Sequence, residues 1–550
     1  MTVHDLSVKE KILQTVILRV TDHKFVPDKV GGVFFGGTII SEPNETGVEA
    51  ARQLISKYIE NADIPLLVTS DFENGCGGMF KGLTNLPFAM SLGAANDEDL
   101  AYEYGKVTAM EARSVGANWS LSPVSDLNLN PWNPLVGERS VGDDPDAACR
   151  LLRQIVRGMQ DNGLAGCAKH FPGDGVDWRD QHRVTTYNTL SMEEWKKLSG
   201  RVFQELIDEG VYSIMAGHIG LPAYQAKKLD EVPPPATLSY ELVTKLLKGE
   251  MGFKGVVITD ALGMGGMMGY HEDELDMCVD SFNAGCDMML WPSAGYVDRM
   301  LRAVETGEVS MERLDDAVSR ILKMKEKLGL FEKDNRPVLL TAEEKAYVRS
   351  VGERVAKGSI TLLRDKKNIF PLNPQTHKRI AIVPVIKTDN YDRVHKEAEL
   401  LAEEFRKRGF DVGYYDPKVS KTPFVKEGTF EGNVMDTGLS KYEVMDSYDA
   451  IIYAMFTRVF RPSGPEDFSH EECIPIKVSL SHAVDRTIAV SFGSPYLIGE
   501  YFERGKACVN AYSQVAFSVE AFVKAAVGET EFATHSPVEL RTPVWRPGLI

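Results

Sequence analysis

Short, continuous apolar runs recur along residues 30 to 290, and each of them ends in a polar or glycine-rich segment. Apolar runs of this length, without an alternating polar face, are typical of strands buried on both sides, as in parallel sheets. The seven runs are VGGVFFGG, IPLLVTSD, GANWSLSPVSD, GLAGCAKHF, GVYSIMAGH, GFKGVVITD and AGCDMMLWP.

Helical patterns occupy most of the gaps between these runs. They include DEDLAYEYGKVTAMEARSVG, DPDAACRLLRQIVRGMQDNG, SMEEWKKLSGRVFQELIDEG and SYELVTKLLKGEMG. Each of these starts at Ser or Asp and ends at Gly, the residues that favour helix starts and stops. Seven strand-then-helix units predict an α/β fold with a TIM-like (β/α) barrel, whose eighth strand the pattern does not place.

A second α/β pattern begins near residue 359, with the runs SITLLRD, RIAIVPVI, GFDVGYYD, YDAIIYAMF, RTIAVSFGSPYL and ACVNAYS. It predicts a smaller, doubly wound α/β sandwich domain. We expect the barrel to span residues 1–335, a linker and connecting helix to span 336–358, and the sandwich domain, with an extended proline-rich tail, to span 359–550.

Composition and charge narrow the classes of function. The 550 residues are 43% hydrophobic and 26% charged, as in ordinary soluble globular proteins. With 79 acidic and 62 basic side chains the net charge is -17, a sign that repels phosphate backbones and anionic lipid, so neither nucleic acid nor membrane is an expected partner. The first twenty residues show neither a signal peptide nor a membrane span, so we expect a cytoplasmic protein.

The cysteines do not indicate a metal site or a disulfide framework. They are odd in number, widely spaced and never in a CxxC pair. No HxH or HExxH motif accompanies the histidines, so we expect no metal. The seven are Cys76, Cys149, Cys167, Cys278, Cys286, Cys473 and Cys508.

Charged side chains gather where the predicted strands end. In a (β/α) barrel the active site lies at the carboxyl ends of the strands, so these residues are candidates for a common site. They are Asp71, Asp126, Lys169, His170, His218 and Asp260.

Asp260 stands at the end of the run GVVITDALGMGG. A carboxylate there acts as a nucleophile, as a metal ligand or as a helix cap, and the residues alone leave these alternatives open. The glycines that follow do not form a GxGxxG nucleotide-binding motif, because the sixth position counted from Gly263 is Met268.

The segment AKHFPGDGVDWRDQH, residues 168 to 182, concentrates proton-handling groups on one loop. Asp180 is close enough to His182 to accept a hydrogen bond from one ring nitrogen, which favours the protonated ring that a general acid needs. The alternative is that Asp180 and His182 are surface residues that merely happen to be neighbours. Lys169 either reaches water or binds oxygen atoms, and Gly173 and Gly175 predict a mobile loop.

The segment resembles the signature K-H-F-P-G-H-G-x4-D-S-H of the β-N-acetylglucosaminidases in glycoside hydrolase family 3. ITDALGM is similar to the nucleophile segment S-D-D-L-x-M of that family, and SDFENG to its D-Q-E-G-G. Further similar segments are NWSLSPVSDLNLNP, VGERSVGDDP, IMAGHIGLPA, AGCDMML, GSITLLRD and VSFGSPYL, so the resemblance covers most of residues 30 to 500.

The resemblance implies a role for each matching position. Asp260 matches the nucleophile that forms a covalent glycosyl-enzyme, His182 the acid/base, and Asp180 its orienting partner. The positions that hold the hydroxyls of the terminal sugar are matched by Asp71, Arg139, Lys169, His170 and His218. In the β-glucosidase branch of the family the acid/base is a Glu from another region, so the loop with His182 selects the N-acetylglucosaminidase branch.

The sequence departs from the family pattern at three positions. Asp174 replaces the second His of the signature, Gln181 replaces its Ser, and Cys76 stands where the family has an Arg. These departures affect the geometry of the loop and the contacts to the leaving group. Trp178 either stacks on a leaving sugar or packs the loop.

The resemblance implies an exo-acting, retaining enzyme that works without a metal or an organic cofactor and releases terminal β-linked N-acetylglucosamine from a glycoside or oligosaccharide. One alternative is a phosphorylase that uses the same site with phosphate as the acceptor, which a His acid/base repels less than a Glu would. Another is a sugar-binding protein of the same fold without turnover. The natural aglycone and the oligomeric state stay open.

Overall fold

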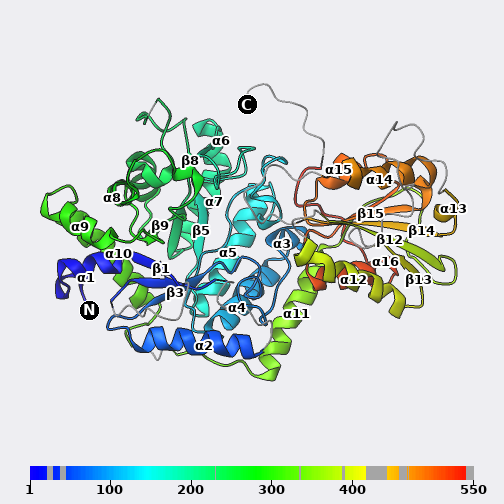
Figure 1. The fold of residues 1–550 in the computed structure, drawn as a ribbon, viewed down its shortest axis with the longest axis horizontal. Coiled ribbons are helices and arrows are strands. Elements are labelled where there is room, and N and C mark those ends of the chain that lie inside the picture. Colours follow the sequence, from blue (N-terminus) through cyan, green and yellow to red (C-terminus); the bar gives the residue numbers. More distant parts are fainter. Residues whose placement is uncertain are drawn as a thin grey trace. The chain divides into compact units, whose positions relative to one another are not determined.

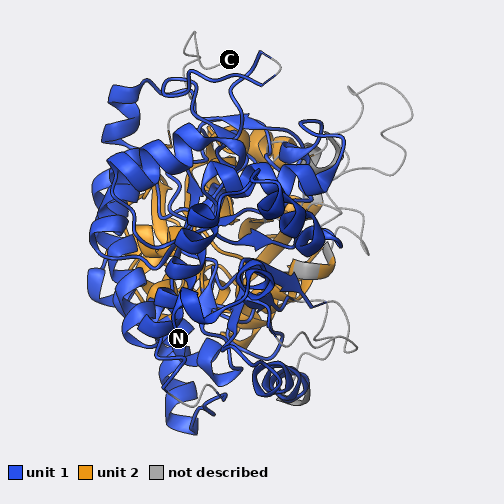
Figure 2. Ribbon diagram, turned by 90° about the vertical axis from the view of Figure 1, so that its left-hand side faces the viewer, with its two compact units in different colours: residues 1–86, 97–351 blue, residues 87–96, 352–550 orange. Residues whose placement is uncertain are grey.

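The computed structural model (Figure 1) describes residues 1–20, 29–36, 45–229, 231–332, 336–386, 391–415, 442–457, 468 and 470–540. The chain divides into two compact units, which Figure 2 colours separately. Unit 1 consists of Met1–Leu86 and Asp97–Val351, and unit 2 of Pro87–Asn96 and Gly352–Ile550. The second unit therefore includes a short segment from far upstream in the sequence, which no hydrophobic pattern predicted.

The described part of unit 1 contains a closed barrel of eight parallel strands. Two sheets, in the orders β10-β1-β2-β3-β4 and β5-β7-β9, make up the ring. Single bridges from Trp119 to Ala165 and from Ile258 to Met288 join the sheets at both edges. The strands are β1 (Val16–Arg19), β2 (Gly32–Phe34), β3 (Leu67–Ser70), β4 (Trp119–Ser120), β5 (Cys167–Phe171), β7 (Ser213–Ala216), β9 (Val256–Thr259) and β10 (Met289–Leu290).

Each of the seven apolar runs contains one of these strands, which confirms the predicted barrel. The eighth strand is β1, which the pattern did not place. It follows helix α1 (Val8–Gln14) after the single residue Thr15, so the strand and the helix merge into one stretch of mixed polarity in the sequence. A separate short pair, β6 (Thr186–Tyr187) and β8 (Ile219–Gly220), runs in parallel register.

The predicted helix starts are confirmed at Asp97, Asp144 and Ser191, whose side chains accept backbone N–H groups of the first turn. The single helix expected from Ser191 onward is broken at Leu198, and the helix expected after Ser239 is wound as a π-helix. The remaining helices of unit 1 are α2 (Glu45–Glu60), α4 (Glu98–Ser114), α5 (Pro145–Asp161), α6 (Met192–Lys197), α7 (Ser199–Asp208), η4 (Glu241–Glu250), α8 (Glu274–Ala284), α9 (Tyr296–Glu305), α10 (Met311–Lys327) and α11 (Ala342–Ser359), the last continuing into unit 2.

The interior of the barrel is filled by side chains. Trp119 is fully buried among residues of the neighbouring strands, such as Leu67 and Met215. Its indole N–H donates to the Ser213 hydroxyl at 2.8 Å, so the polar atom of this large core residue has a partner. The packed core fixes the directions in which the strands deliver their carboxyl ends.

The described part of unit 2 contains a six-stranded sheet in the order β11-β16-β15-β14-β12-β13. Within these residues the edge strand β11 alone runs antiparallel to its neighbour. Each of the six runs predicted for this domain contains one strand. The bounds are β11 (Thr361–Asp365), β12 (Arg379–Ile386), β13 (Asp411–Tyr414), β14 (Ala450–Phe456), β15 (Thr487–Phe492) and β16 (Ala507–Asn510).

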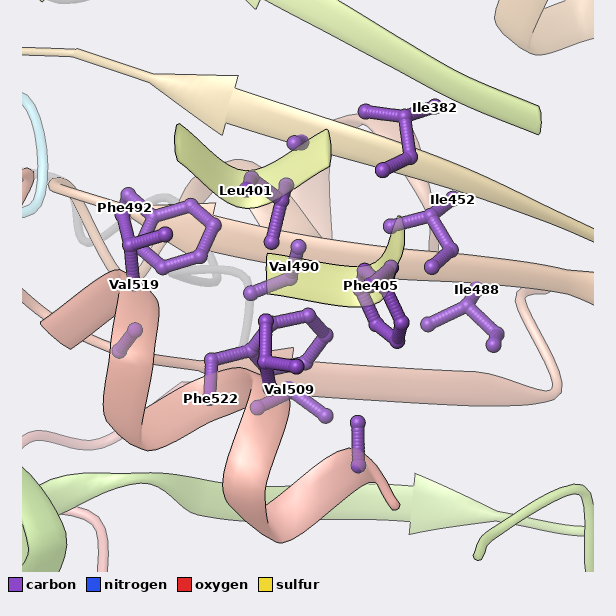
Figure 3. Close-up of a cluster of buried hydrophobic side chains, with 14 of the residues drawn as sticks. Ile382, Leu401, Phe405, Ile452, Ile488, Val490, Phe492, Val509, Val519 and Phe522 are labelled. Carbon is purple, nitrogen blue, oxygen red and sulfur yellow. The ribbon is translucent and has the colours of Figure 1, made fainter. Parts of the chain in front are cut away.

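Both faces of this sheet are covered, as a doubly wound domain requires. On one face, α12 and α16 bring Phe405 and Phe522 against strand residues such as Ile452 and Val490 (Figure 3). On the other, residues of α13 to α15 pack against Ile451 and its neighbours. The helices are α12 (Tyr391–Lys407), α13 (Tyr442–Asp446), α14 (His470–His482), α15 (Leu497–Tyr501) and α16 (Ala516–Ala526).

The upstream segment of unit 2 is held by its own apolar contacts. Helix α3 (Ala89–Ala95) packs Met90 and Ala94 in a cluster with Tyr512 and Val538. Within the part of the chain that the structure describes, none of the helices has both the length and the apolar character needed to cross a bilayer.

A buried carboxyl fastens the loop that follows β3. Glu111 of α4 is 5% exposed and accepts hydrogen bonds from the Thr84 backbone N–H at 3.0 Å and the Thr84 hydroxyl at 2.7 Å. Burial raises the pKa of Glu111 to about 7, although the bonds from Thr84 oppose the rise.

This pKa predicts a pH dependence of stability. Between the ordinary glutamate pKa of 4.5 and about 7, the folded state binds more protons than the unfolded chain, so stability falls as pH rises through that window. A Glu111→Gln variant should lose this pH-dependent change in the free energy of unfolding, which is about 3 kcal/mol at most. Calorimetric melting of both proteins at pH 5 and pH 7.5 measures it. Equal losses of stability in the two proteins would contradict the assignment.

Candidate active site

The candidate residues from the sequence converge at the carboxyl ends of the barrel strands. Asp71 follows β3, Lys169 and His170 lie in β5, His218 follows β7 and Asp260 follows β9. Arg139 ends the short helix η2 (Gly137–Arg139), beyond β4. Their charges act on one another, as the pKa shifts described below indicate.

An ion cluster occupies one side of this mouth. Lys169 Nζ lies 2.9 Å from Asp71 Oδ1 and 2.7 Å from Glu73 Oε1. Arg139 donates two hydrogen bonds to Glu73, each of 2.8 Å, and a third to the Leu135 carbonyl. The side chains of Lys169 and Arg139 are only 4% and 13% exposed. The cluster therefore holds two nearly buried cations with charge-assisted bonds.

These pairings set the charge states of the cluster. Burial alone would raise the pKa of Glu73, but the charges of Arg139 and Lys169 hold it well below its usual range. Burial lowers the pKa of Lys169, but Asp71 and Glu73 together raise it above the ordinary lysine value. Glu73, Lys169 and Arg139 are therefore ionised at neutral pH and present fixed charges to a ligand.

His170 is held by a buried carboxylate. Its Nδ1 lies 2.7 Å from Asp126 Oδ2, and its backbone N–H also donates to Asp126. Among the described residues, none forms a hydrogen bond with His170 Nε2, so this nitrogen is available to a ligand.

The predicted dyad is formed. His182 Nδ1 lies 2.8 Å from Asp180 Oδ1, which also accepts the His182 backbone N–H at 2.8 Å. Burial lowers the pKa of His182, but the bond to Asp180 and the charge of Asp260 outweigh it, so the pKa lies above 6.5. The ring is 37% exposed, and its Nε2 has no hydrogen-bond partner in the described part of the chain. The interpretation as an unconnected surface pair is wrong.

Asp260 does not cap a helix. The short helix that follows, η5 (Gly265–Met267), has Met264 at its N-cap position, and Asp260 Oδ1 accepts the adjacent Ala261 N–H at 2.7 Å. Burial would raise the pKa of Asp260, but the charges of three histidines and the Ala261 N–H lower it below 3.8. The carboxylate is therefore ionised and half-buried at the mouth. The three histidines are His218, His170 and His182.

Both ring nitrogens of His218 are already occupied. Nδ1 lies 2.9 Å from the Thr237 hydroxyl and Nε2 lies 3.0 Å from the Ala261 carbonyl. Burial lowers the pKa of His218 below 6.5. In this arrangement His218 holds the residue next to Asp260 and has no ring nitrogen left for a ligand.

The loop that carries the dyad is tied to its neighbours. Gly265 donates to the His182 carbonyl at 2.9 Å and Gly266 to the Gln181 carbonyl at 3.0 Å. Gly175 has φ +88°, and a Cβ there would lie 2.0 Å from the Leu127 carbonyl oxygen, so only glycine allows this close approach. The mobility expected from the glycines stays a prediction, and in the structure these bonds attach the loop to Gly265 and Gly266.

Two carboxylates of the site were not singled out from the sequence for the roles they have here. Glu73 joins Lys169 to Arg139, and Asp126 orients His170. Both follow a buried strand by a few residues, and Asp126 was noted on that ground, but the pattern does not reveal their partners. Trp178 is 51% exposed, so it is not packed as an anchor of the loop.

Among the described residues there is no group of three or more His, Cys, Asp or Glu side chains arranged to hold a metal ion. The carboxylates Asp71, Glu73, Asp126 and Asp180 instead pair with Lys, Arg and His side chains. The arrangement offers one ionised carboxylate, one protonatable imidazole and several fixed polar groups, which is the equipment for covalent glycosyl transfer.

Comparisons with known proteins find relatives among the glycoside hydrolases. A model of the glycosyl hydrolase family 3 N-terminal domain matches residues 7–324. The β-N-acetylglucosaminidase/β-glucosidase of Cellulomonas fimi is 30% identical over 574 aligned positions, covering 99% of this chain and 96% of that protein.

Two solved structures are similar over nearly the whole chain. The β-glucoside phosphorylase BglX superposes with a TM-score of 0.85 and 29% identity, covering 99% of this chain and 95% of that one. A glycoside hydrolase family 3 β-N-acetylglucosaminidase from Paenibacillus sp. str. FPU-7 gives a TM-score of 0.81 and 27% identity, with coverage of 98% and 100%.

The environments of two histidines predict opposite titrations. His182 should titrate above the ordinary value of 6.5 and His218 below it, which histidine NMR spectra recorded against pH will show. An Asp180→Asn variant removes a group that raises the pKa of His182, so the midpoint of His182 should fall while that of His218 stays. Midpoints near 6.5 for both rings, or no response to the substitution, would contradict the assigned contacts.

Proposed function

The chain belongs to glycosyl hydrolase family 3, and we propose that it is an exo-acting, retaining β-N-acetylglucosaminidase that cleaves terminal β-linked N-acetylglucosamine. The observation that carries this proposal is the meeting of ionised Asp260 with the Asp180–His182 pair at the mouth of the barrel. The similarity to proteins described as β-N-acetylglucosaminidases supports the choice of substrate.

The first step transfers the sugar to the enzyme. Asp260 Oδ1 accepts the Ala261 N–H, so we assign the attack on the anomeric carbon to Oδ2. As the bond from Oδ2 to that carbon forms, the bond to the leaving oxygen breaks, and the proton on His182 Nε2 passes to that oxygen. The raised pKa of His182 favours the protonated ring that donates this proton.

The second step releases the sugar. His182, now neutral, takes a proton from water through Nε2, and the water oxygen bonds to the anomeric carbon while the bond to Asp260 breaks. Two inversions at the same carbon leave its configuration unchanged. Asp180 holds the ring through Nδ1, so the same nitrogen faces the reaction in both steps.

The remaining side chains would bind the terminal sugar. Asp71, Lys169 and Arg139 present fixed charges at the mouth, and His170 has a free Nε2 held in place by Asp126. These groups fit the hydroxyls of a sugar, since charged donors and acceptors fix the orientation of a polar ligand. His218 would act by holding Ala261, and with it Asp260, in place.

Phosphate is a second candidate for the acceptor. His182 is neutral or cationic where a carboxylate acid/base would be anionic, so it does not repel an incoming phosphate. The similarity to the β-glucoside phosphorylase BglX over nearly the whole chain favours the same alternative. A sugar-binding protein without turnover would not need both Asp260 and the assembled dyad.

Removal of the nucleophile tests the proposed chemistry. Asp260→Ala should lower turnover on the order of 10⁴-fold or more, with its melting temperature close to that of the wild type. Asp287→Asn is a matched control, because Asp287 is a buried carboxylate just before β10 that pairs with Lys248 and Arg313. It should lower the melting temperature and keep turnover per folded molecule. An Asp260→Ala protein with near-normal turnover would refute the assignment.

The acceptor is tested by product analysis. The enzyme is given the p-nitrophenyl β-N-acetylglucosaminide and the corresponding glucoside, each with and without inorganic phosphate. Hydrolysis predicts free sugar at a rate that phosphate does not change, and faster release from the N-acetyl substrate. A glycosyl phosphate formed only when phosphate is present would make the enzyme a phosphorylase, and preference for the glucoside would contradict the proposed substrate.

A further inference from the structure

Gln181, which precedes His182, is fully buried, and both ends of its side chain are bonded. Its Nε2 donates to Asp174 Oδ2 at 3.2 Å, and its Oε1 accepts the His218 backbone N–H at 2.9 Å. A buried amide with its donor and acceptor both satisfied makes a rigid connection, because breaking either bond leaves a polar group unpaired. Gln181 thus joins the loop of the dyad to the end of β7.

Asp174 is a fixed support for this connection. It is 2% exposed, and its Oδ1 accepts the Asn133 amide at 2.8 Å and the Gly175 N–H at 2.7 Å. Its own N–H donates to Asp126, the carboxylate that orients His170. Asn133, Gly175, Asp126 and Gln181 all bond to Asp174. Through Asp174 the amide of Gln181 is connected to Asp126 and His170, on the side of the mouth where the sugar would bind.

The other end of Gln181 leads to the nucleophile. The His218 backbone that it holds follows β7, and the His218 ring contacts the Ala261 carbonyl. The Asp260 N–H also donates to the carbonyl of Ala216, the last residue of β7, at 3.0 Å. The buried side chain of Gln181, the residue next to His182, is therefore bonded to the backbone segment that positions Asp260.

Asp174 and Gln181 are also the two positions at which the loop departs from the family signature. In this chain they bond to each other, so the two departures form one structural unit rather than two independent changes. His182 itself is 37% exposed, so packing leaves part of its ring uncovered.

We propose that Gln181, supported by Asp174, is a positioning residue that holds His182 Nε2 in line with the leaving oxygen. This inference rests on the proposed function, in which His182 is the acid/base. A displacement of about 1 Å in a reacting group can cost roughly 100-fold in rate. The loss should appear only where the proton of His182 is needed.

Leaving groups of different acidity isolate that proton. A dinitrophenolate leaves without protonation, whereas an alkyl leaving group requires the acid, and kcat/KM reports the steps up to bond cleavage. Gln181→Ala should lower kcat/KM for alkyl glycosides about 10- to 100-fold and that for the dinitrophenyl glycoside less than about threefold. Equal losses on both substrates would mean a general structural defect and would overturn the proposal.

Gln225→Ala is the matched control. Gln225 is also a buried glutamine of the barrel, whose Oε1 accepts the Leu221 N–H and whose Nε2 donates to the Pro234 carbonyl. It has no bond to the loop of the dyad. Its loss should lower stability and leave the ratio of the two kcat/KM values at the wild-type level, and a changed ratio would overturn the proposal.

Reversing the direction of the hydrogen bond between Gln181 and Asp174 provides a second test, which does not require the Gln181→Ala protein to fold. In Asp174→Asn, two amide donors face each other, and in Gln181→Glu, two carboxylates do. In the double variant Asp174→Asn/Gln181→Glu, the new amide can donate to the new carboxylate, which still accepts the His218 N–H. Each single variant should lose alkyl-glycoside activity, and the double variant should recover at least tenfold over the worse single variant. Additive losses would overturn the proposal.

His182→Ala separates this inference from the proposed function. If it lowers kcat/KM for alkyl glycosides far more than for the dinitrophenyl glycoside, His182 is the acid, and the result for Gln181→Ala then decides the inference alone. If His182→Ala affects both substrates equally, the proposed function fails first, and the inference falls with it.

Discussion

Two nearly buried cations at the mouth of the barrel share one carboxylate, and the geometry of the site follows from this pairing. Removing an ion from water costs several kcal/mol, and Glu73 offsets part of this cost by accepting bonds from both Lys169 and Arg139, while Asp71 also pairs with Lys169. Glu73 follows β3, Lys169 lies in β5 and Arg139 ends η2, beyond β4. One carboxylate therefore connects three segments of the barrel mouth and holds charged groups on the side where a sugar would bind.

Charged and polar partners also give three histidines of the same site different properties. His182 is paired with Asp180 and its pKa is raised, whereas His218 bonds to a hydroxyl and a carbonyl and its pKa is lowered by burial. His170 is oriented by Asp126. Partner and burial, not residue type, thus decide which ring can deliver a proton. The lowered pKa of Asp260 keeps that carboxylate anionic, so the site pairs an ionised carboxylate with an imidazole whose protonated form is favoured.

The sequence predicted the strands and the ends at which the candidate residues gather, because continuous apolar runs and strand-end charges are local signals. It missed β1, which follows α1 after one residue, and it did not predict that Pro87–Asn96 belongs to unit 2. It also did not reveal that Glu73 holds two cations or that Gln181 contacts Asp174. Such contacts join side chains across different strands and loops, and they depend on the closed barrel rather than on any periodicity. Asp180 and His182 could be paired in advance because they lie two residues apart.

The central claim is that Asp260 becomes covalently bonded to the sugar, and trapping of that intermediate tests it most directly. A fluorinated N-acetylglucosaminyl fluoride forms the glycosyl-enzyme quickly and slows its breakdown, because the fluorine on the ring destabilises the positively charged transition states while fluoride remains a good leaving group. Mass spectrometry of the inactivated, digested protein should find one added sugar, on the peptide that contains Asp260. An enzyme that turns over the substrate but carries the label on another residue would contradict the account.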